Sequence, residues 1–312
     1  MSRTIIVITA ALALAATLPA VSTQAQSIRT FVSTAGTDNP SCSLASPCRH
    51  FSAAVAATAV GGEVDALDPG AYGSFTISQA ISIEGQGWSY VAPPANGAAI
   101  TINAVSGNIN IRGVSLNGVG VTNATGIQFN SGGSLHVQNS VIRNFTLSGI
   151  NFVPNSATVS QILVSNTPVS DNGNGIVINS NGSGTTNGVL DHVQMENNGT
   201  NGLAVVTGTQ TINVTVSDSV SASNANNGIV ADSISATLVN IMVRNSTLAN
   251  NGVDGLLAQN AGATIRVTRS TITGNAVGWA VGSPGAVLSY GDNNIDGNMS
   301  ANTEPPSPLT YK

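Results

Sequence analysis

The residues that come nearest to a catalytic cluster are Asp191, His192 and Asp218. A carboxylate and an imidazole are common partners in general acid-base catalysis, because their proton affinities can be tuned towards neutral pH. Arg244 and Arg269 follow further along the chain, and we expect them to neutralise such carboxylates. These side chains can act together only if the fold brings them into one groove with a substrate.

Residues 1–25 have the composition of an export signal. Arg3 supplies a positive start, residues 5–18 form an apolar run, and a cleavage site is plausible before Gln26. The run is shorter than the ~20 apolar residues of a membrane-spanning helix, so a membrane anchor is the weaker alternative. No later segment is long enough to span a bilayer. We therefore expect the mature chain to be exported, to the periplasm or outside the cell.

The two cysteines, Cys42 and Cys48, lie six positions apart in the sequence. In an oxidising compartment this spacing favours a disulfide that closes a short loop. Two free thiols are the alternative. Zinc is not expected, because His50 alone would not complete a set of four ligands.

The composition excludes several classes of protein. Charged residues make up 7% of the 312 residues, whereas about a quarter is typical, and this excludes coiled coils and helical bundles. A hydrophobic share of 41% excludes disorder. The net charge of -5, with scattered arginines, gives no basic patch for nucleic acid. The 35 asparagines and 34 glycines indicate strands and turns.

A glycine followed by a large apolar residue recurs along the chain at intervals of 23 to 27 residues. A period in the twenties is typical of a solenoid, and helical solenoids need longer repeats. We expect three strands in each coil and roughly nine or ten coils. Successive side chains of a strand point to opposite faces. The apolar residue of each anchor and the residue two positions later, such as Ile150 and Phe152, are therefore expected to point into the interior. The anchors are Gly126-Ile127, Gly149-Ile150, Gly175-Ile176, Gly202-Leu203, Gly228-Ile229, Gly255-Leu256 and Gly278-Trp279.

The asparagines recur in the same register as the anchors. Asparagine tolerates the left-handed conformation of tight turns, and stacked asparagines can bond to one another along the axis. We expect this role before the anchors and after the second strand of the coil; glycosylation of Asn123, Asn144 and Asn213 is the alternative. The turn residues are Asn144, Asn172, Asn198, Asn224, Asn251 and Asn275 before the anchors, and Asn139, Asn166 and Asn245 after the second strand.

The repeat also predicts where the candidate catalytic residues lie within a coil. Asp191, His192 and Asp218 stand where neighbouring repeats carry Asn, Ser, Thr or Arg, so we expect them to be structural, with catalysis as the alternative. Asp232 and Asp254 are expected to be solvated turn residues. The residue directly after each anchor is expected to point outward, and none of these residues is charged. They are Gln128, Asn151, Val177, Ala204, Val230, Leu257 and Ala280.

The two ends of the chain depart from the repeat. Residues 51–60 are rich in alanine and predict a helix that ends at Gly61-Gly62 and covers the first coil. The Pro-rich segment 301–312 is expected to be a tail on the surface or a loose end. The predicted organisation is a signal (1–25), a cap with the disulfide loop and the helix (26–74), β-helix repeats (75–300) and this tail.

Several motifs resemble right-handed parallel β-helix proteins of the pectin-lyase-like superfamily. They are residues 31–38, Ser46-Pro47-Cys48, residues 68–72, the Asn…Gly-Ile coils and residues 288–293. The last of these is similar to exported bacterial members without assigned activity. The resemblance implies an all-β, three-strand solenoid with a short N-terminal capping helix.

Enzymes of that superfamily cut or epimerise acidic polysaccharides, commonly on the face after the anchors. Their Asn-Thr-Asp, Asp-Asp, Gly-His-Gly and Arg-Ile-Lys patterns do not occur in this sequence, and Asp68-Pro69 is followed by Gly70 where the epimerases carry His. A lyase of this kind would also need calcium on several carboxylates. Residues 189–192, Val-Leu-Asp-His, resemble a lyase motif without its Trp.

We therefore predict no catalytic residue, no cofactor and no metal. The expected function is that of an exported scaffold, which binds a glycan or a cell-surface partner along its side. The alternative is a lyase or hydrolase that acts on an acidic polysaccharide, and carboxylates converging in a groove would favour it.

Overall fold

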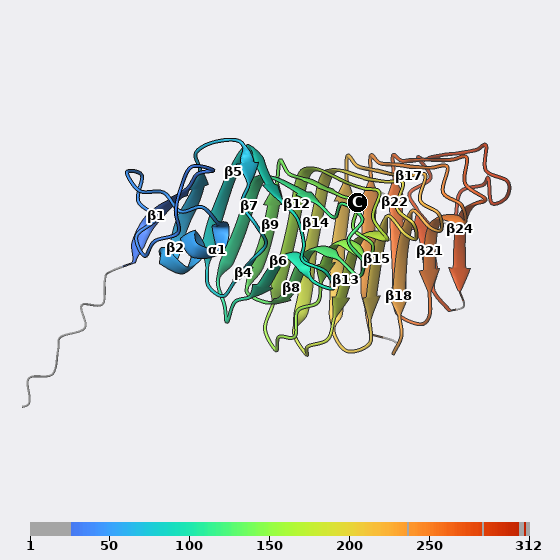
Figure 1. The fold of residues 1–312 in the computed structure, drawn as a ribbon. Coiled ribbons are helices and arrows are strands. Elements are labelled where there is room, and N and C mark those ends of the chain that lie inside the picture. The colour runs from blue at the N-terminus through green and yellow to red at the C-terminus, as the bar shows by residue number, and fades with distance from the viewer. Residues whose placement is uncertain (1–25, 236, 283, 306–308, 310–312) are drawn as a thin grey trace, which may run out of the picture.

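The computed structural model describes residues 26–305, apart from 236 and 283, and residue 309. It is 56% strand and 3% helix, and it forms a parallel β-solenoid of about 8 turns (Figure 1). This confirms the predicted all-β parallel β-helix with one short helix near its N-terminal end. The predicted export signal, residues 1–25, lies outside the described residues. In the described part of the chain, no helix has the length and apolar character needed to cross a membrane.

Nine strands, one from each successive coil, form a sheet that we call the anchor sheet because the glycine anchors lie in it or at its start. The nine strands, one from each coil, are separated by eight turns, in agreement with the lower end of the expected nine or ten coils. The chain before Phe75 builds the cap instead of a further anchor strand. The anchor sheet consists of β4 (Phe75–Ile77), β6 (Ala98–Asn103), β8 (Thr125–Ser131), β11 (Ser148–Phe152), β13 (Asn174–Ser180), β15 (Leu203–Thr207), β18 (Ile229–Ser233), β21 (Asp254–Gln259) and β24 (Val277–Gly282).

The other strands form a second, bent sheet that supplies the two remaining sides of each coil. Its longest strands, such as β12 and β14, continue through the bend. In other coils the strand is interrupted at the bend, so that two shorter strands form. The bent sheet consists of β1 (Ser27–Val32), β2 (Thr58–Ala66), β3 (Gly70–Ala71), β5 (Ile81–Val91), β7 (Asn108–Asn117), β9 (Ser134–Gln138), β10 (Val141–Arg143), β12 (Ser160–Ser170), β14 (Thr185–Glu196), β16 (Thr211–Ser217), β17 (Val220–Ala222), β19 (Val239–Arg244), β20 (Thr247–Ala249), β22 (Ala263–Thr268), β23 (Thr271–Thr273), β25 (Ala286–Ser289) and β26 (Asn294–Ile295).

The interior of the solenoid is filled by the residues that the alternation predicted. Ile150 and Phe152 are fully buried, as are their register partners in the adjacent coils. The rings of Phe129 and Phe152 stack with their centroids 4.3 Å apart. Because every coil repeats the same inward positions, equivalent side chains stack on one another along the axis.

Buried asparagines form the predicted ladder along the turn before the anchors. The side-chain amide of Asn224, for example, donates to Asn251 Oδ1 at 2.9 Å and accepts from Asn198 Nδ2 at 2.9 Å. Asn144 has the predicted left-handed turn conformation, with φ +61°, and its Nδ2 donates to Asn117 Oδ1 at 3.0 Å in the preceding coil. It lies outside the buried ladder, because Phe145 fills the ladder position in that coil. The buried members are Asn172, Asn198, Asn224, Asn251, Asn275 and Asn298.

The helix α1 (Phe51–Ala57) packs at the N-terminal end, with the ring of Phe51 against those of Tyr72 and Phe75. It ends earlier than predicted, and Gly61 lies inside β2. Thr58 is the cause: its backbone is extended, and its hydroxyl donates to Ala54 O at 2.6 Å. The β-branched Thr58 therefore turns the chain into a strand before the glycines are reached.

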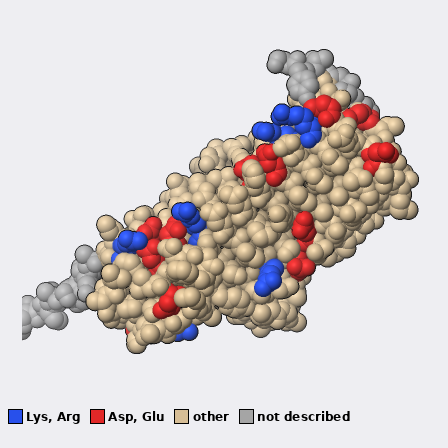
Figure 2. Space-filling model, turned by 90° about the horizontal axis from the view of Figure 1, so that it is seen from above, with Lys and Arg blue, Asp and Glu red and all other residues tan. Residues whose placement is uncertain are grey.

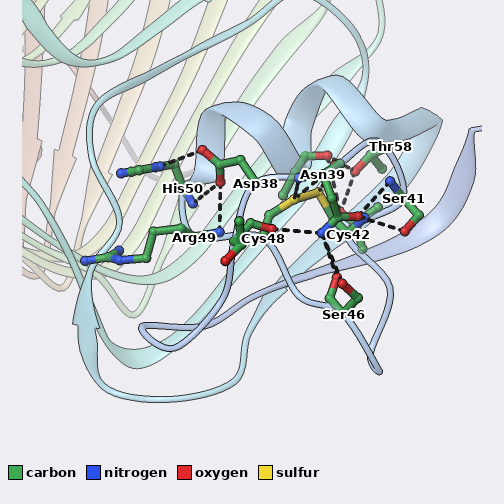
Figure 3. Close-up of a disulfide and its surroundings, with 12 residues drawn as sticks. Asp38, Asn39, Ser41, Cys42, Ser46, Cys48, Arg49, His50 and Thr58 are labelled. Atoms are coloured by element: carbon green, nitrogen blue, oxygen red, sulfur yellow. Dashed lines mark hydrogen bonds and ion pairs between the residues drawn. A yellow bond between two sulfur atoms is a disulfide. The ribbon is translucent and has the colours of Figure 1, made fainter.

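The predicted disulfide between Cys42 and Cys48 is confirmed (Figure 3). Both half-cystines are buried, and the loop between them is attached to β1, where Phe31 N donates to Cys42 O and Cys48 N donates to Phe31 O. Asn39 also holds the loop, because its side-chain oxygen accepts from the backbone N–H groups of Ser41 and Cys42. The disulfide thus closes a loop of the cap that backbone hydrogen bonds attach to β1.

Candidate functional site

The structure brings Asp191 and His192 into contact on the outside of the bent sheet. His192 Nδ1 lies 2.9 Å from Asp191 Oδ2, and Ser217 Oγ donates to Asp191 Oδ1 at 2.6 Å. The bond from Ser217, followed by that with His192, lowers the pKa of Asp191, and the same contact with Asp191 raises the pKa of His192. The two side chains therefore form an exposed hydrogen-bonded pair, which becomes an ion pair when His192 is protonated.

Asp218 lies in the next coil, at the turn that the sequence predicted. It has φ +50°, and His192 at the equivalent place has φ +53°, both in the left-handed region that Asn139, Asn166 and Asn245 also occupy. Asp218 accepts a hydrogen bond from Asn245 Nδ2 and lies 3.8 Å from Arg244 Nη2. These contacts support a structural role for the residues of this turn.

We expect the substitution Asp218→Asn to lower the free energy of unfolding by at most about 1 kcal/mol, because asparagine already fills this left-handed position in other coils. Equilibrium denaturation of the variant and the parent protein measures the difference. A loss above about 2 kcal/mol would show that the carboxylate has a stronger role than this turn requires.

The outer face of the anchor sheet carries the uncharged row predicted from the sequence. Strand register aligns its members in consecutive coils, from Gln128 and Asn151 to Leu257 and Ala280. We call these seven residues the central row. Ala204 and Val230, near its middle, are only 7% and 6% exposed, so this part of the row is flat and closely packed.

A row of side-chain amides borders the central row at the start of the strands. Asn201 Nδ2 donates to Asn174 Oδ1 at 3.4 Å, and Asn227 Nδ2 donates to Asn201 Oδ1 at 3.0 Å. We call Asn174, Asn201 and Asn227 the amide row. Asp254 takes the next position, and its backbone N–H donates to Asn227 Oδ1 at 3.0 Å.

Asp254 is not the solvated turn residue that the sequence suggested, because β21 begins at it and leaves it only 6% exposed. Burial raises the pKa of its carboxyl group. Within the described part of the chain, no hydrogen bond or ion pair reaches that carboxyl. No pattern in the sequence indicates this burial, since burial at the start of a strand depends on how adjacent coils stack.

A second polar border lies on the other side of the central row. It contains Asn179, Val206, Asp232 and Gln259, which are aligned by register. Asp232 also lies in a strand rather than in a turn, and its two carboxylate oxygens accept from Gln259 Nε2 at 2.8 Å and Asn260 Nδ2 at 2.7 Å. Unlike Asp254, it has partners for both oxygens.

The two acids of this face are too far apart to act as a catalytic pair. Asp254 and Gln259, the register partner of Asp232, are five residues apart in one strand, which corresponds to about 16 Å. Paired glycosidase carboxylates stand roughly 5–9.5 Å apart. The central row and its two borders also lack any lysine or arginine.

A charged groove near the N-terminal end was missed in the sequence. It has a volume of about 530 Å³, and its ionisable lining residues are Arg29, Glu63, Asp65, Glu84 and Arg112. Arg29 Nε lies 2.6 Å from Asp65 Oδ2 and 3.2 Å from Glu63 Oε1. Figure 2 shows that charged side chains on this view of the molecule gather in a few mixed clusters separated by wide uncharged surface.

The groove raises the proton affinity of two of its acids. Burial and then the charge of Asp65 raise the pKa of Glu63, and burial raises the pKa of Glu84 although Arg112 opposes it. The available sequence signal was the spacing of Glu63 and Asp65, which places both on one face of a strand. The repeat does not reveal that these acids meet other charged residues, because these coils precede the first anchor and their residues cannot be aligned with those of later coils.

The acids of the charged groove do not fit the calcium that the lyase alternative would need. Among residues 26–305, as described, no three His, Cys, Asp or Glu side chains are placed to hold a metal ion. The guanidinium of Arg29 bridges Glu63 and Asp65 instead. A cation there would have to displace this arginine.

No protein-family model matches this chain, and the search of curated proteins finds no match. The similar solved structures include the following two. One is the crystal structure of pectate lyase Pel9A, with a TM-score of 0.59 and 14% identity, covering 90% of this chain and 78% of that one. The other is the mannuronan C-5 epimerase AlgE4 A-module of Azotobacter vinelandii, with a TM-score of 0.52 and 14% identity, covering 80% of this chain and 91% of that one. The chain therefore shares the parallel β-helix fold of these two structures.

Proposed function

We propose that this protein is an exported scaffold that binds a glycan chain along the outer face of the anchor sheet without cleaving it. The observation that carries the proposal is the arrangement of that face: an uncharged central row, apolar from Val177 to Ala280, with hydrogen-bonding side chains before and after it along the strands. A sugar ring presents apolar C–H surface and hydroxyl groups at its edge, so it can lie on such a row and bond to both borders. The similarity of fold to glycan-acting proteins supports this class of ligand.

The distribution of acids on this face supports binding over cleavage. Asp232 is held by Gln259 and Asn260, and Asp254 stands about 16 Å along the strand from that position. These two acids are therefore too far from each other to form the carboxyl pair that glycoside hydrolysis requires.

The test is the substitution Leu257→Arg, which places a long charged side chain in the central row. We expect affinity for the bound polysaccharide to fall at least about tenfold, because the cation covers the apolar surface that the sugar would contact. Affinity electrophoresis with a panel of neutral and acidic polysaccharides measures this. Met242→Arg is the matched control: it changes a half-buried outward residue of the bent sheet, next to Arg266 in register. Equal binding by both variants would contradict the proposed face.

The charged groove favours a second candidate function, cleavage of a polysaccharide. Asp65 and Glu84 are register partners in adjacent strands, so their backbones are about 4.8 Å apart, and Glu63 lies on the same face. Convergence of carboxylates in a groove was the feature expected of an enzyme. Under this candidate, Glu84→Gln abolishes the appearance of new chain ends while Leu257→Arg leaves it unchanged; no new chain ends with the parent protein would exclude it for the substrates tested.

A further inference from the structure

Strand β5 carries a bulge beside the charged groove that is larger than the single extra residue of an ordinary bulge. Residues 85–88 of β5 stand opposite the single residue Gly113 of β7. Gly113 has φ +64°, and an added Cβ would lie 2.8 Å from the backbone nitrogen of Gly87, so only glycine fits there. Ser89 Oγ donates to Gly85 O at 2.8 Å at the base of the bulge. The local sequence therefore builds this bulge, and bulges commonly re-aim a side chain next to a site.

The bulge ends on Trp88, the most exposed aromatic side chain among the described residues. Trp88 is 46% exposed, whereas Ser89 and Val91 are fully buried, so strand alternation places Trp88 and Tyr90 together on the outer face. Tyr90 is half-buried and lies about 7 Å further along the strand. Its register partners in the two adjacent coils are an alanine and a serine, which leave room beside the rings. We call Trp88 and Tyr90 the aromatic pair.

The aromatic pair continues directly from the wall of the charged groove. Gln86 and Gly87, the two residues before Trp88, line the groove together with Gly113. Adjacent Cα atoms are about 3.8 Å apart, so Trp88 stands at the rim. The groove volume of about 530 Å³ is within the range of sites that hold small ligands. A ligand longer than one ring can therefore lie in the groove and extend past Gly87 towards the indole.

The charged side chains of the groove divide into a closed and an open set. In the closed set, Arg29 is held by Glu63 and Asp65. The open set is Glu84 and Arg112, which are register partners about 4.8 Å apart in their backbones. Neither makes a hydrogen bond or an ion pair in the described part of the chain, even with the other. They offer a ligand one acceptor and one donor side by side.

This combination of groups indicates a sugar. A purely apolar ligand would leave the open set without partners, and a purely ionic one would not use the exposed indole. A pyranose ring has a C–H face that can lie on an aromatic ring, and its hydroxyl groups both donate and accept. Adjacent hydroxyl groups can therefore bond to a carboxyl and a guanidinium at once. Three acids and two arginines line the groove, so a neutral sugar is favoured over a uronate.

We infer that the aromatic pair and the open set form a second glycan site, which binds a short neutral hexose oligosaccharide without cleaving it. One ring stacks on Trp88, and the adjoining ring in the groove bonds to Glu84 and Arg112. The inference goes beyond the proposed function, because this site lies on the bent sheet and needs neither the central row nor its borders.

Tryptophan fluorescence can isolate this site, because the chain has two tryptophans. Trp279 lies in β24, at the opposite end of the solenoid, and its Nε1 donates to Thr303 O at 2.8 Å (Figure 1). The variant Trp279→Phe therefore reports on Trp88 alone. The probes are maltotriose, cellotriose, laminaritriose and mannotriose, with trigalacturonate as the acidic probe, all at one ionic strength. We expect a saturable change in emission with at least one neutral trisaccharide.

Calorimetry with the same trisaccharide tests the individual residues. We expect the affinity to fall at least about tenfold in Trp88→Ala and in Arg112→Ala. Trp88→Phe keeps a ring, so we expect a loss of less than about threefold, without the change in emission. Val105→Ala is the matched control, since it truncates a 95% exposed apolar side chain outside the groove; we expect a change below about twofold. Melting temperatures within about 2 °C of the parent show that each variant is folded.

The outcomes are distinguishable from a failure of the proposed function. We expect Leu257→Arg, combined with Trp279→Phe, to keep the trisaccharide response of Trp88, whether or not it weakens polysaccharide binding. Loss of that response would mean that the second site is not separate, and the inference would be wrong. It would also be wrong if Trp88→Ala binds as the parent does, or if no trisaccharide changes the emission of Trp88. Tighter binding of trigalacturonate than of every neutral probe would overturn the class of sugar.

Discussion

Replacing Asn224 by alanine is expected to lower the free energy of unfolding by about 4 kcal/mol, because one amide serves several buried partners at once. Its Nδ2 donates to Asn251 Oδ1 at 2.9 Å and to Met195 O at 3.1 Å, and its Oδ1 accepts from the backbone and the side chain of Asn198. The residue is 1% exposed, so water cannot replace these bonds without entering the core. Each buried group that loses its hydrogen-bond partner costs about 1–3 kcal/mol. The neighbouring coils are destabilised as well, because each coil depends on contacts with its neighbours.

The matched control is Asn226→Ala, two residues away in the same turn. The Asn226 side chain is exposed, and no side-chain hydrogen bond is found for it among the described residues. We expect a change within about 0.5 kcal/mol, measured by urea denaturation monitored by circular dichroism. Similar losses in both variants would contradict the stabilising role of the ladder.

Replacing Phe152 by alanine is expected to lower the free energy of unfolding by a similar amount, about 4 kcal/mol. Phe152 is fully buried, and its ring stacks on that of Phe129 with an interplanar angle of 21°. The substitution removes apolar burial, leaves a cavity between two coils and breaks an aromatic pair. The coils above and below are fixed by their backbone ladders, so they cannot close the cavity.

Phe152→Leu tests whether volume or aromatic stacking dominates this effect. Leucine keeps most of the buried apolar volume, and we expect it to recover more than half of the loss, again by urea denaturation. An alanine variant as stable as the parent protein would mean that the two stacked phenylalanines do not pack as described.

The repeat made most of the fold predictable. Each anchor glycine recurs at nearly constant spacing, and inward residues such as Ile150 and Phe152 follow from strand alternation. The ladder was predictable for the same reason, except where Phe145 replaces asparagine. The helix end was not predictable from Gly61-Gly62, because the hydroxyl of Thr58 ends the helix locally.

The candidate site was only partly predictable, because its chemistry depends on contacts between coils. The central row follows from the alternation after each anchor. Burial of Asp254 does not, since the sequence shows an acid beside Gly255 but not that a strand begins there. The charged groove joins Arg29 to Glu63 and Glu84 across coils that precede the repeat, where no period indicates which residues align.

The most direct test of the account is one incubation of the parent protein with each polysaccharide, assayed both for bound protein and for new reducing or unsaturated chain ends. We predict saturable binding to at least one of the polysaccharides, weakened by Leu257→Arg and not by Met242→Arg, with no new chain ends. New chain ends that disappear in Glu84→Gln, together with binding that Leu257→Arg leaves intact, would contradict it and place the function in the charged groove.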